Sequence, residues 1–388
     1  MYPCSADFHT AVRNGNPQKA LLIFSDCVFT NDDINVENGI QFNDYFNLEE
    51  DIAIGQTPSN EISFSLFNDD RLLNNYGFGD FIATLGVLVR EDSYSQRGIC
   101  MVVVGNDTYL TDSRSPYIRK NGTALGTQPN WQIRSMLAYD GKLYCFGETE
   151  ADYIVYNLNT GSVVSTTINA FMRRKAYNFW NGKGMYYHDR TANGITIHEL
   201  LIWKAGVKQT YEFVPLGHFT ADRPKAPDKI QIDMVCNDLM MKFDKDYTDN
   251  KPSVTYPVTL SSLYAALCNS VGVSYRTPSP FINGTATLSE EPEDFDTASK
   301  RDVLKWIAEA ACANARIDRD GYVILDWVRS TNQSYDATGY EEFEPYWYQT
   351  PSVSKLYNRD SNGSEDKTVG SGSQGYLILD NPILKGVS

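Results

Sequence analysis

The chain has 388 residues, a formal net charge of −15 at pH 7 and 42% hydrophobic residues. This length suits two or three domains with cores of their own, whereas the acidic charge argues against a protein that wraps nucleic acid, which needs a basic surface. No stretch approaches the roughly 18 consecutive apolar residues of a membrane-spanning helix, and residues 1–7 lack the basic and apolar regions of a signal peptide. We therefore expect neither a signal peptide nor stable membrane insertion.

Seven cysteines are spread along the chain, without a Cys-x-x-Cys pair or a Cys/His cluster at metal-binding spacing. This pattern predicts folding in a reducing cytoplasm without structural disulfides. Cys268 and Cys312 lie among apolar residues, so we expect both to be small core residues.

Aromatic residues make up 13% of the chain, and aromatic side chains favour strands. Asn-Gly, a signal for tight turns, occurs seven times, beginning at residues 14, 38, 121, 181, 193, 283 and 362. Together these features predict a strand-rich protein with many hairpins.

The first segment, from about Ala20 to Val89, contains stretches that alternate apolar and polar side chains with period 2, which is typical of a β-barrel or β-sandwich. Ile52 and Ile54 belong to this alternation. The expected strands are Ala20–Phe24, Ile34–Phe42 around the Asn38-Gly39 turn, and Ile62–Leu66.

Residues 98–205 contain further hairpin signals, at Met101–Val104, Gly141–Phe146, Tyr153–Asn157 and Gly194–Ile197. Gly141–Gly161 is similar to one blade of a propeller, but radial closure needs about four or more copies and no second copy follows. We interpret this segment as a β-rich insertion.

Alternation returns over Tyr211–Phe243, whose end, Asn237–Phe243, fits either a short helix or the end of a strand. Residues 257–328 have an α+β pattern. A helix opens at Thr259 and stops at Gly272, with an apolar face spaced by four residues at Leu263, Leu267 and Val271.

A second helix is expected after Ser299, which suits an N-cap, with Asp302 as its capping-box acid. The alanine-rich end of this helix predicts close packing. A hairpin then pairs Ala315–Asp318 with Tyr322–Trp327. The tail contains a polar loop, Asn358–Gly372, and a strand, Gly375–Leu379.

No motif of a serine hydrolase, zinc protease or nucleotide-binding protein occurs in the chain. The four histidines, His9, His188, His198 and His218, are scattered. His188-Asp189-Arg190 is similar to a kinase triplet, but the glycine-rich loop and the lysine of kinases are missing. We therefore predict no enzymatic activity, no cofactor, and no catalytic, cofactor-binding or metal-binding residue.

Two acidic or aromatic segments leave alternatives open. Glu290–Asp296 could bind a cation through carboxylates, but it lacks the spacing of an EF-hand, and a solvated loop is the commoner reading. Trp180-Asn181 and Tyr186–Asp189 would suit a sugar-binding face, although strand aromatics more often pack a core.

Three stretches follow one another along the chain: Ile34–Leu66, Tyr211–Phe243 and Thr259–Tyr322. Their order resembles the tail-hub and tail-tip proteins of tailed phages and prophages, a family that includes the baseplate hub of contractile tails. The resemblance covers most of the chain outside residues 98–205. The tail from Gly375 to Leu384 also looks like the family's strand leading into a second barrel, after which relatives continue, so we expect a trimmed product, a fragment or a short variant.

The resemblance implies an α+β, mostly β fold with barrel-like tail-hub domains. The first barrel would be discontinuous, formed by 1–97 and 206–250, and interrupted by the β-rich insertion 98–205. A small α+β domain with two helices and a hairpin would occupy 251–335, and the start of a second barrel-like domain would occupy 336–388.

The resemblance also implies a structural role in the virion tail tip, after folding in the host bacterial cytoplasm. The subunit would form a homo-oligomeric ring, a trimer, that joins the tail tube to the tip and serves host attachment and genome ejection. Its expected partners are the distal tail ring, the tape-measure protein and tip or fibre proteins, with DNA passing transiently through the channel. An acidic channel would repel DNA and keep it sliding.

Two alternatives come from different classes of function. One is a tail-associated cell-wall hydrolase, because relatives often carry such an activity after the hub. The other is a tail protein that binds carbohydrate on the host surface through residues 98–205.

Overall fold

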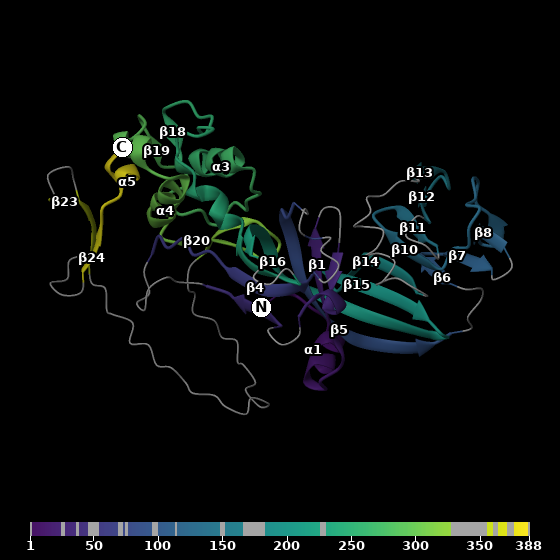
Figure 1. Cartoon of the computed structure of the whole chain (residues 1–388). Coiled ribbons are helices and arrows are strands. Elements are labelled where there is room, and N and C mark those ends of the chain that lie inside the picture. Colours follow the sequence, from purple (N-terminus) through teal and green to yellow (C-terminus); the bar gives the residue numbers. More distant parts are fainter. Residues whose placement is uncertain are drawn as a thin grey trace. The chain divides into compact units, whose positions relative to one another are not determined.

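A computed structural model of the chain describes residues 2–24, 28–35, 39–45, 54–68, 73, 77–94, 100–112, 115–147, 152–165, 183–225, 230–326, 355–359, 364–370 and 376–386. The chain divides into two compact units (Figure 1). Unit 1 comprises residues 1–40, 63–216 and 223–234, and unit 2 comprises 41–62, 217–222 and 235–388. This division is coarser than the four domains expected from the sequence, whose boundaries stay a prediction.

The fold is α+β and mostly β, as the sequence predicts. Strands β3 (Ile40–Asn43), β4 (Glu61–Phe67), β16 (Val207–Lys225) and β17 (Gln231–Asp238) contain residues of both units. The other elements of unit 1 are α1 (Ala6–Arg13), β1 (Gln18–Phe24), β2 (Val28–Thr30), η1 (Asn31–Asp33), β5 (Asp80–Ser93), β6 (Met101–Val104), β7 (Asp107–Asp112), β8 (Ser115–Lys120), β9 (Thr123–Ala124), β10 (Ser135–Tyr139), β11 (Lys142–Phe146), β12 (Tyr153–Asn157), β13 (Val163–Ser165), β14 (Gly184–Ala192) and β15 (Ile195–Lys204).

The large sheet is mixed, with the strand order β13-β12-β11-β10-β14-β15-β16-β17-β4-β3. Strand β5 also pairs with β16 and with β1, and β1 pairs with β2. Within the described residues no sheet closes on itself. The expected strands Ala20–Phe24 and Ile62–Leu66 are confirmed as parts of β1 and β4.

The β-rich segment of unit 1 is buried on both faces of its main sheet. One face packs against the four-stranded sheet β6-β7-β8-β9, with Val102 and Tyr109 of the small sheet and Leu143 and Tyr156 of the large sheet in the core between them. The opposite face shares a second core with β1 through residues such as Leu21. Double burial explains why strands such as β12 are continuously apolar instead of alternating.

Two of the seven Asn-Gly pairs form hairpin turns within the described residues. Asn121-Gly122 and Asn193-Gly194 join β8 to β9 and β14 to β15, with positive φ at both residues, as a type I′ turn requires. Asn14-Gly15 instead ends helix α1, because Asn14 is its C-cap. The Asn38-Gly39, Asn181-Gly182 and Asn362-Gly363 pairs include residues outside the described part.

Unit 2 confirms both predicted helices. Helix α3 (Leu260–Val271) begins after the N-cap Thr259 and ends at Gly272, whose φ is +70°. Helix α4 (Lys300–Ala310) has the predicted capping box between Ser299 and Asp302. The apolar faces of both helices lie in one core. The remaining elements are η3 (Leu239–Asp244), β18 (Val258–Thr259), β19 (Thr287–Leu288), η4 (Glu293–Thr297), β20 (Asn314–Ile317), β21 (Val323–Asp326), β22 (Lys355–Arg359), β23 (Glu365–Gly370), β24 (Tyr376–Leu379) and α5 (Pro382–Gly386).

The predicted hairpin forms as β20 and β21, with Ala315 opposite Leu325. For Asn237–Phe243 the sequence allowed either a short helix or the end of a strand. The structure has a short 3-10 helix, η3, capped by Asp238. Trp327, Ile52 and Trp180-Asn181 lie outside the described residues.

Two sequence predictions in unit 2 are wrong. Cys312 is exposed, because its own backbone is left-handed, with φ of +54°, and turns the chain away after the end of α4. Cys268 is buried, as expected. The expected polar loop Asn358–Gly372 contains strand β23, which pairs with β22. A strand at the edge of a small sheet can be polar, so the sequence of β23 lacks the alternation of apolar and polar residues by which strands are predicted.

Candidate functional site

Three of the four histidines lie in unit 1, each beside a side chain that can hydrogen-bond to it. His9 Nε2 is 3.3 Å from the sulfur of Cys4. His188 and His198 occupy neighbouring strands, β14 and β15. His218 lies in unit 2, with its ring against Gly321.

Strand β14 separates the side chains of the His188-Asp189-Arg190 triplet onto opposite faces, because successive residues of a strand alternate. On one face, the buried Glu199 carboxylate accepts hydrogen bonds from the Arg190 guanidinium, at 2.9 and 3.0 Å, and its other oxygen is 3.4 Å from His188 Nε2. On the other face, Asp189 Oδ1 is 2.7 Å from His198 Nδ1. The triplet is therefore not one kinase-like centre.

The Asp189 face carries a hydrogen-bonded chain of three side chains. The Asp189 carboxylate can only accept, so Nδ1 of His198 holds the hydrogen between them. In the neutral ring Nε2 is then an acceptor, and the Tyr2 hydroxyl lies 3.2 Å from it. Asp189 and His198 stay accessible, with 58% and 24% of their side-chain surface exposed.

Tyrosines border this chain on the same face of the sheet. Tyr187 is two residues before Asp189 on β14, and its ring centroid is 5.8 Å from that of Tyr139 on β10. Burial, with the nearby charge of Asp189, raises the pKa of Tyr187, and burial raises the pKa of Tyr139 as well. Both hydroxyls therefore stay protonated at neutral pH and can donate as well as accept hydrogen bonds.

The N-terminal segment is fixed to the sheet at a second point. Glu212 on β16 is buried, and its two carboxylate oxygens accept hydrogen bonds from the backbone N–H of Ser5 at 2.8 Å and from its hydroxyl at 2.5 Å. Ser5 is also the N-cap of α1, because its side chain accepts from the N–H of Phe8. Three residues before Ser5, Tyr2 lies beside His198, a contact between residues far apart in sequence that no local pattern indicates.

The acidic segment Glu290–Asp296 is solvated, as expected. Glu290, Glu293, Asp294 and Asp296 are exposed, and Glu291 forms an ion pair with Lys251 at 2.6 Å. Phe295 turns inward from η4 and stacks on Trp306, with ring centroids 5.8 Å apart. Phe295 is thus the residue of this acidic segment that packs into the core of unit 2.

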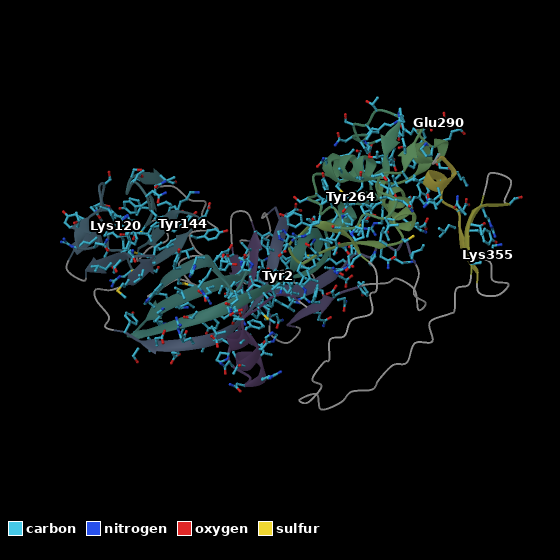
Figure 2. All side chains as sticks on the ribbon, turned by 180° about the vertical axis from the view of Figure 1, so that it is seen from behind. Tyr2, Lys120, Tyr144, Tyr264, Glu290 and Lys355 are labelled. Carbon is cyan, nitrogen blue, oxygen red and sulfur yellow. The ribbon has the colours of Figure 1, made fainter. Side chains whose placement is uncertain are left out.

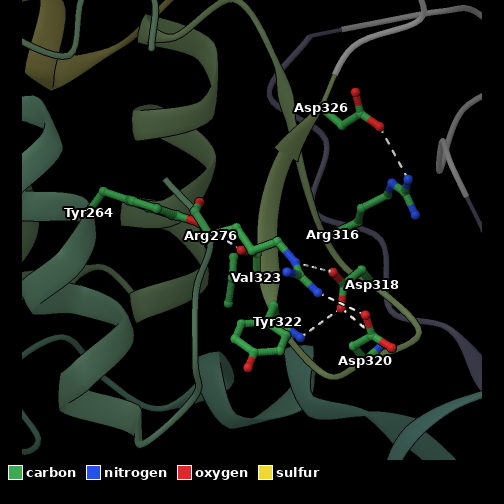
Figure 3. A network of polar contacts seen from close by, with 8 residues as sticks. All are labelled: Tyr264, Arg276, Arg316, Asp318, Asp320, Tyr322, Val323 and Asp326. Atoms are coloured by element: carbon green, nitrogen blue, oxygen red, sulfur yellow. Dashed lines mark hydrogen bonds and ion pairs between the residues drawn. The ribbon is translucent and has the colours of Figure 1, made fainter. Parts of the chain in front are cut away.

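A second polar network fastens the β20–β21 turn to the chain that follows α3 (Figure 3). Arg276 forms ion pairs with Asp318 and Asp320, each at 2.8 Å, and its guanidinium lies 4.2 Å from the ring centre of Tyr322. The hydrogen bond to Asp318 raises the pKa of Arg276 further. Each charged group of this network has a partner of opposite charge within it, and the two ion pairs hold the turn against Arg276.

Two carboxyl groups of unit 2, those of Asp238 and Glu309, are buried, which no sequence pattern predicts. Asp238 accepts hydrogen bonds from the Ser59 hydroxyl and from the N–H groups of Asn60 and Met240, while burial raises its pKa to about 6. Burial likewise raises the pKa of Glu309 to about 7. Both groups join segments within unit 2, and Asp238 in particular is the N-cap of η3.

Within the described residues, no group of three or more His, Cys, Asp or Glu side chains could hold a metal ion. In the same part of the chain, no helix is long and apolar enough to cross a membrane. A scan against protein-family models finds no match. A search of curated proteins finds no relative either.

Proposed function

We propose that the chain is a structural subunit of a phage tail tip or baseplate hub. In this role it forms a ring that joins the tail tube to the tip and encloses the channel for DNA. The proposal starts from the order of the three stretches that resemble the hub family. It places the subunit in the virion, as a homotrimer in contact with the distal tail ring, the tape-measure protein and tip or fibre proteins.

The observation that carries the proposal is the fold of the third stretch. The sequence order of a helix, a capped helix and an Asp-Gly hairpin is realised as α3, α4 and β20–β21 around one core. The Tyr264 hydroxyl of α3 donates a 2.9 Å hydrogen bond to the carbonyl of Val323 in the hairpin (Figure 3). The motif order thus corresponds to one packed structural element.

The ends of the large sheet give a physical reason for assembly. Among the described strands, β13, β3 and β2 are each paired with a single neighbour in this sheet. Backbone groups of an end strand can pair with another chain, and a closed ring is one way to use such edges without open-ended growth. In the ring we expect barrel-like hub domains, because each barrel would be completed or enclosed on assembly.

The test is the oligomeric state of the purified chain. Light scattering should give a mass three times the 43.7 kDa of one chain, and negative-stain images should show a ring with threefold symmetry. A strict monomer at every concentration, or a particle of another symmetry, would contradict the proposal. Release of fragments from purified peptidoglycan by the same sample would favour the cell-wall hydrolase instead.

A further inference from the structure

Three tyrosines of the β-rich segment share one face of the main sheet in unit 1. Leu137 of β10 is opposite Tyr144 of β11, and Tyr139 is two residues further along β10, so Tyr139 and Tyr144 point to the same side. In the parallel pairing of β10 with β14, Ala138 is level with Tyr186, which places Tyr139 beside Tyr187. We call Tyr139, Tyr144 and Tyr187 the tyrosine cluster.

The tyrosine cluster lies where the core of this face opens to solvent. Tyr144 and Tyr187 are partly buried against the core that contains Phe146, whereas Tyr139 is 42% exposed. Figure 2 shows Tyr144 on the sheet of β10–β13. The cluster therefore presents aromatic surface that is held in place by packing, which reduces the entropy lost when a ligand binds.

Hydrogen-bonding groups stand next to this aromatic surface on the same face. Asp189 follows Tyr187 by two residues, and its nearness to both Tyr187 and Tyr139 raises the pKa of each phenol beyond the effect of burial. His198 and Tyr2 continue the row from Asp189. The row offers a carboxylate, an imidazole and a phenol at the border of the rings.

This combination matches the chemistry of a saccharide. A pyranose has a face of C–H groups, which packs on aromatic rings, and a rim of hydroxyls, which donate to carboxylates and accept from phenols. Asp189 and Asp140 are the acidic groups beside the rings, and Lys142, which is opposite Tyr139, forms an ion pair with Asp140 at 3.9 Å. The site therefore keeps one negative charge in excess, that of the exposed Asp189, which repels anionic ligands. The ligand that fits is a neutral sugar.

We propose that the tyrosine cluster, with Asp189 and His198, is a binding site for a neutral polysaccharide. Tyr139 supplies the exposed stacking surface, and Asp189 accepts hydrogen bonds from sugar hydroxyls. The site is independent of the proposed hub function, because it is built from unit 1 of a single chain.

The test is electrophoresis of the full chain in native gels that contain dextran, mannan, laminarin or, as an anionic probe, polygalacturonate. At least one neutral polysaccharide should retard the chain, and polygalacturonate should not. Tyr139→Ala should weaken the retarding interaction about tenfold. Tyr117→Ala is the matched control, because Tyr117 is an exposed tyrosine of the small sheet, on β8, and its loss should leave binding unchanged.

Asp189→Asn is a second variant, which keeps the volume and a hydrogen-bond acceptor for His198 but removes the charge. It should weaken binding to the neutral polysaccharide several-fold, and its melting temperature confirms that it is folded. The proposal is overturned if no neutral gel retards the wild-type chain, if Tyr139→Ala binds as tightly as Tyr117→Ala, or if polygalacturonate is the preferred probe. None of these outcomes depends on whether the chain forms a ring.

Discussion

Replacing Lys300 by methionine should destabilise unit 2 strongly, although the residue is a lysine at the start of a helix. Its side chain is buried, with 1% of its surface exposed. The ammonium donates hydrogen bonds to the carbonyl of Asp246 at 3.0 Å, to that of Tyr247 at 3.4 Å, and to that of Asp249. Burial lowers its pKa. The lysine thereby closes a carbonyl-lined loop onto α4.

The magnitude follows from what Lys300→Met leaves behind. A buried carbonyl without a partner costs about 1–3 kcal/mol, and the carbonyls of Tyr247 and Asp249 lose their donor here. The carbonyl of Asp246 still accepts a 3.1 Å hydrogen bond from the N–H of Asp249. Methionine avoids the desolvation cost of the ammonium, which is several kcal/mol. It also has a similar helix propensity. We therefore expect a net loss of about 2 kcal/mol in the free energy of unfolding.

The assay is urea unfolding, together with hydrogen exchange of the amides that join the loop to α4. The N–H of Tyr247 is bonded to the carbonyl of Ala298, and that of Lys300 to Lys245, so both should exchange faster in the variant. Lys305→Met is the control, because Lys305 is exposed on the same helix and should change stability by less than about 0.5 kcal/mol. If both variants lower the free energy of unfolding by the same amount, the hydrogen bonds from the ammonium to the carbonyls do not stabilise unit 2, and the reasoning is refuted.

Three further predictions concern other buried groups. Burial raises the pKa of Glu309 to about 7, so the native state holds this proton at pH values where the unfolded chain has released it. The resulting contribution to stability is present at low pH and disappears as pH rises through 7. The melting temperature of Glu309→Gln should therefore fall less than that of the wild type between pH 5 and pH 8, and an equal fall in both proteins would contradict this. Gly184→Ala should cost more than about 3 kcal/mol, because the new Cβ would overlap the carbonyl oxygen of Met101; chemical denaturation measures this, and a cost below about 1 kcal/mol would show that the two strands separate easily. Tyr264→Phe should lose about 1 kcal/mol with its bond to the Val323 carbonyl, and a stability equal to wild type in thermal unfolding would indicate that water replaces the hydroxyl.

The sequence predicts elements well where the signal is local. Helix α4 was expected from Ser299 and Asp302, and the structure contains that capping box. Helix α5 was missed, because five residues give too few turns for an apolar period to emerge. Its anchor, the buried Asn381, is held by Asn358 and Glu309, which no local pattern connects to it.

The candidate site was predictable only in part. The run Tyr186–Asp189 does suggest a sugar-binding face, but the strand splits it, so that only Tyr187 and Asp189 face the site. Tyr139 and His198 join them through strand pairing, and Tyr2 through the N-terminal segment. Partners brought together by long-range pairing cannot be read from spacing along the chain.

The pairing of β4 with β17 has a consequence for synthesis. At about 5–20 residues per second, a ribosome needs roughly 10–30 s to proceed from Phe67 to Gln231. During that interval β4 and its neighbour β3 have been made, but β17, its neighbour on the other side, has not. A largely apolar strand with one open edge is a target for pairing with other chains. Yield of the protein should therefore depend on how fast it is translated and on chaperones that shield β4 while the rest of the chain emerges.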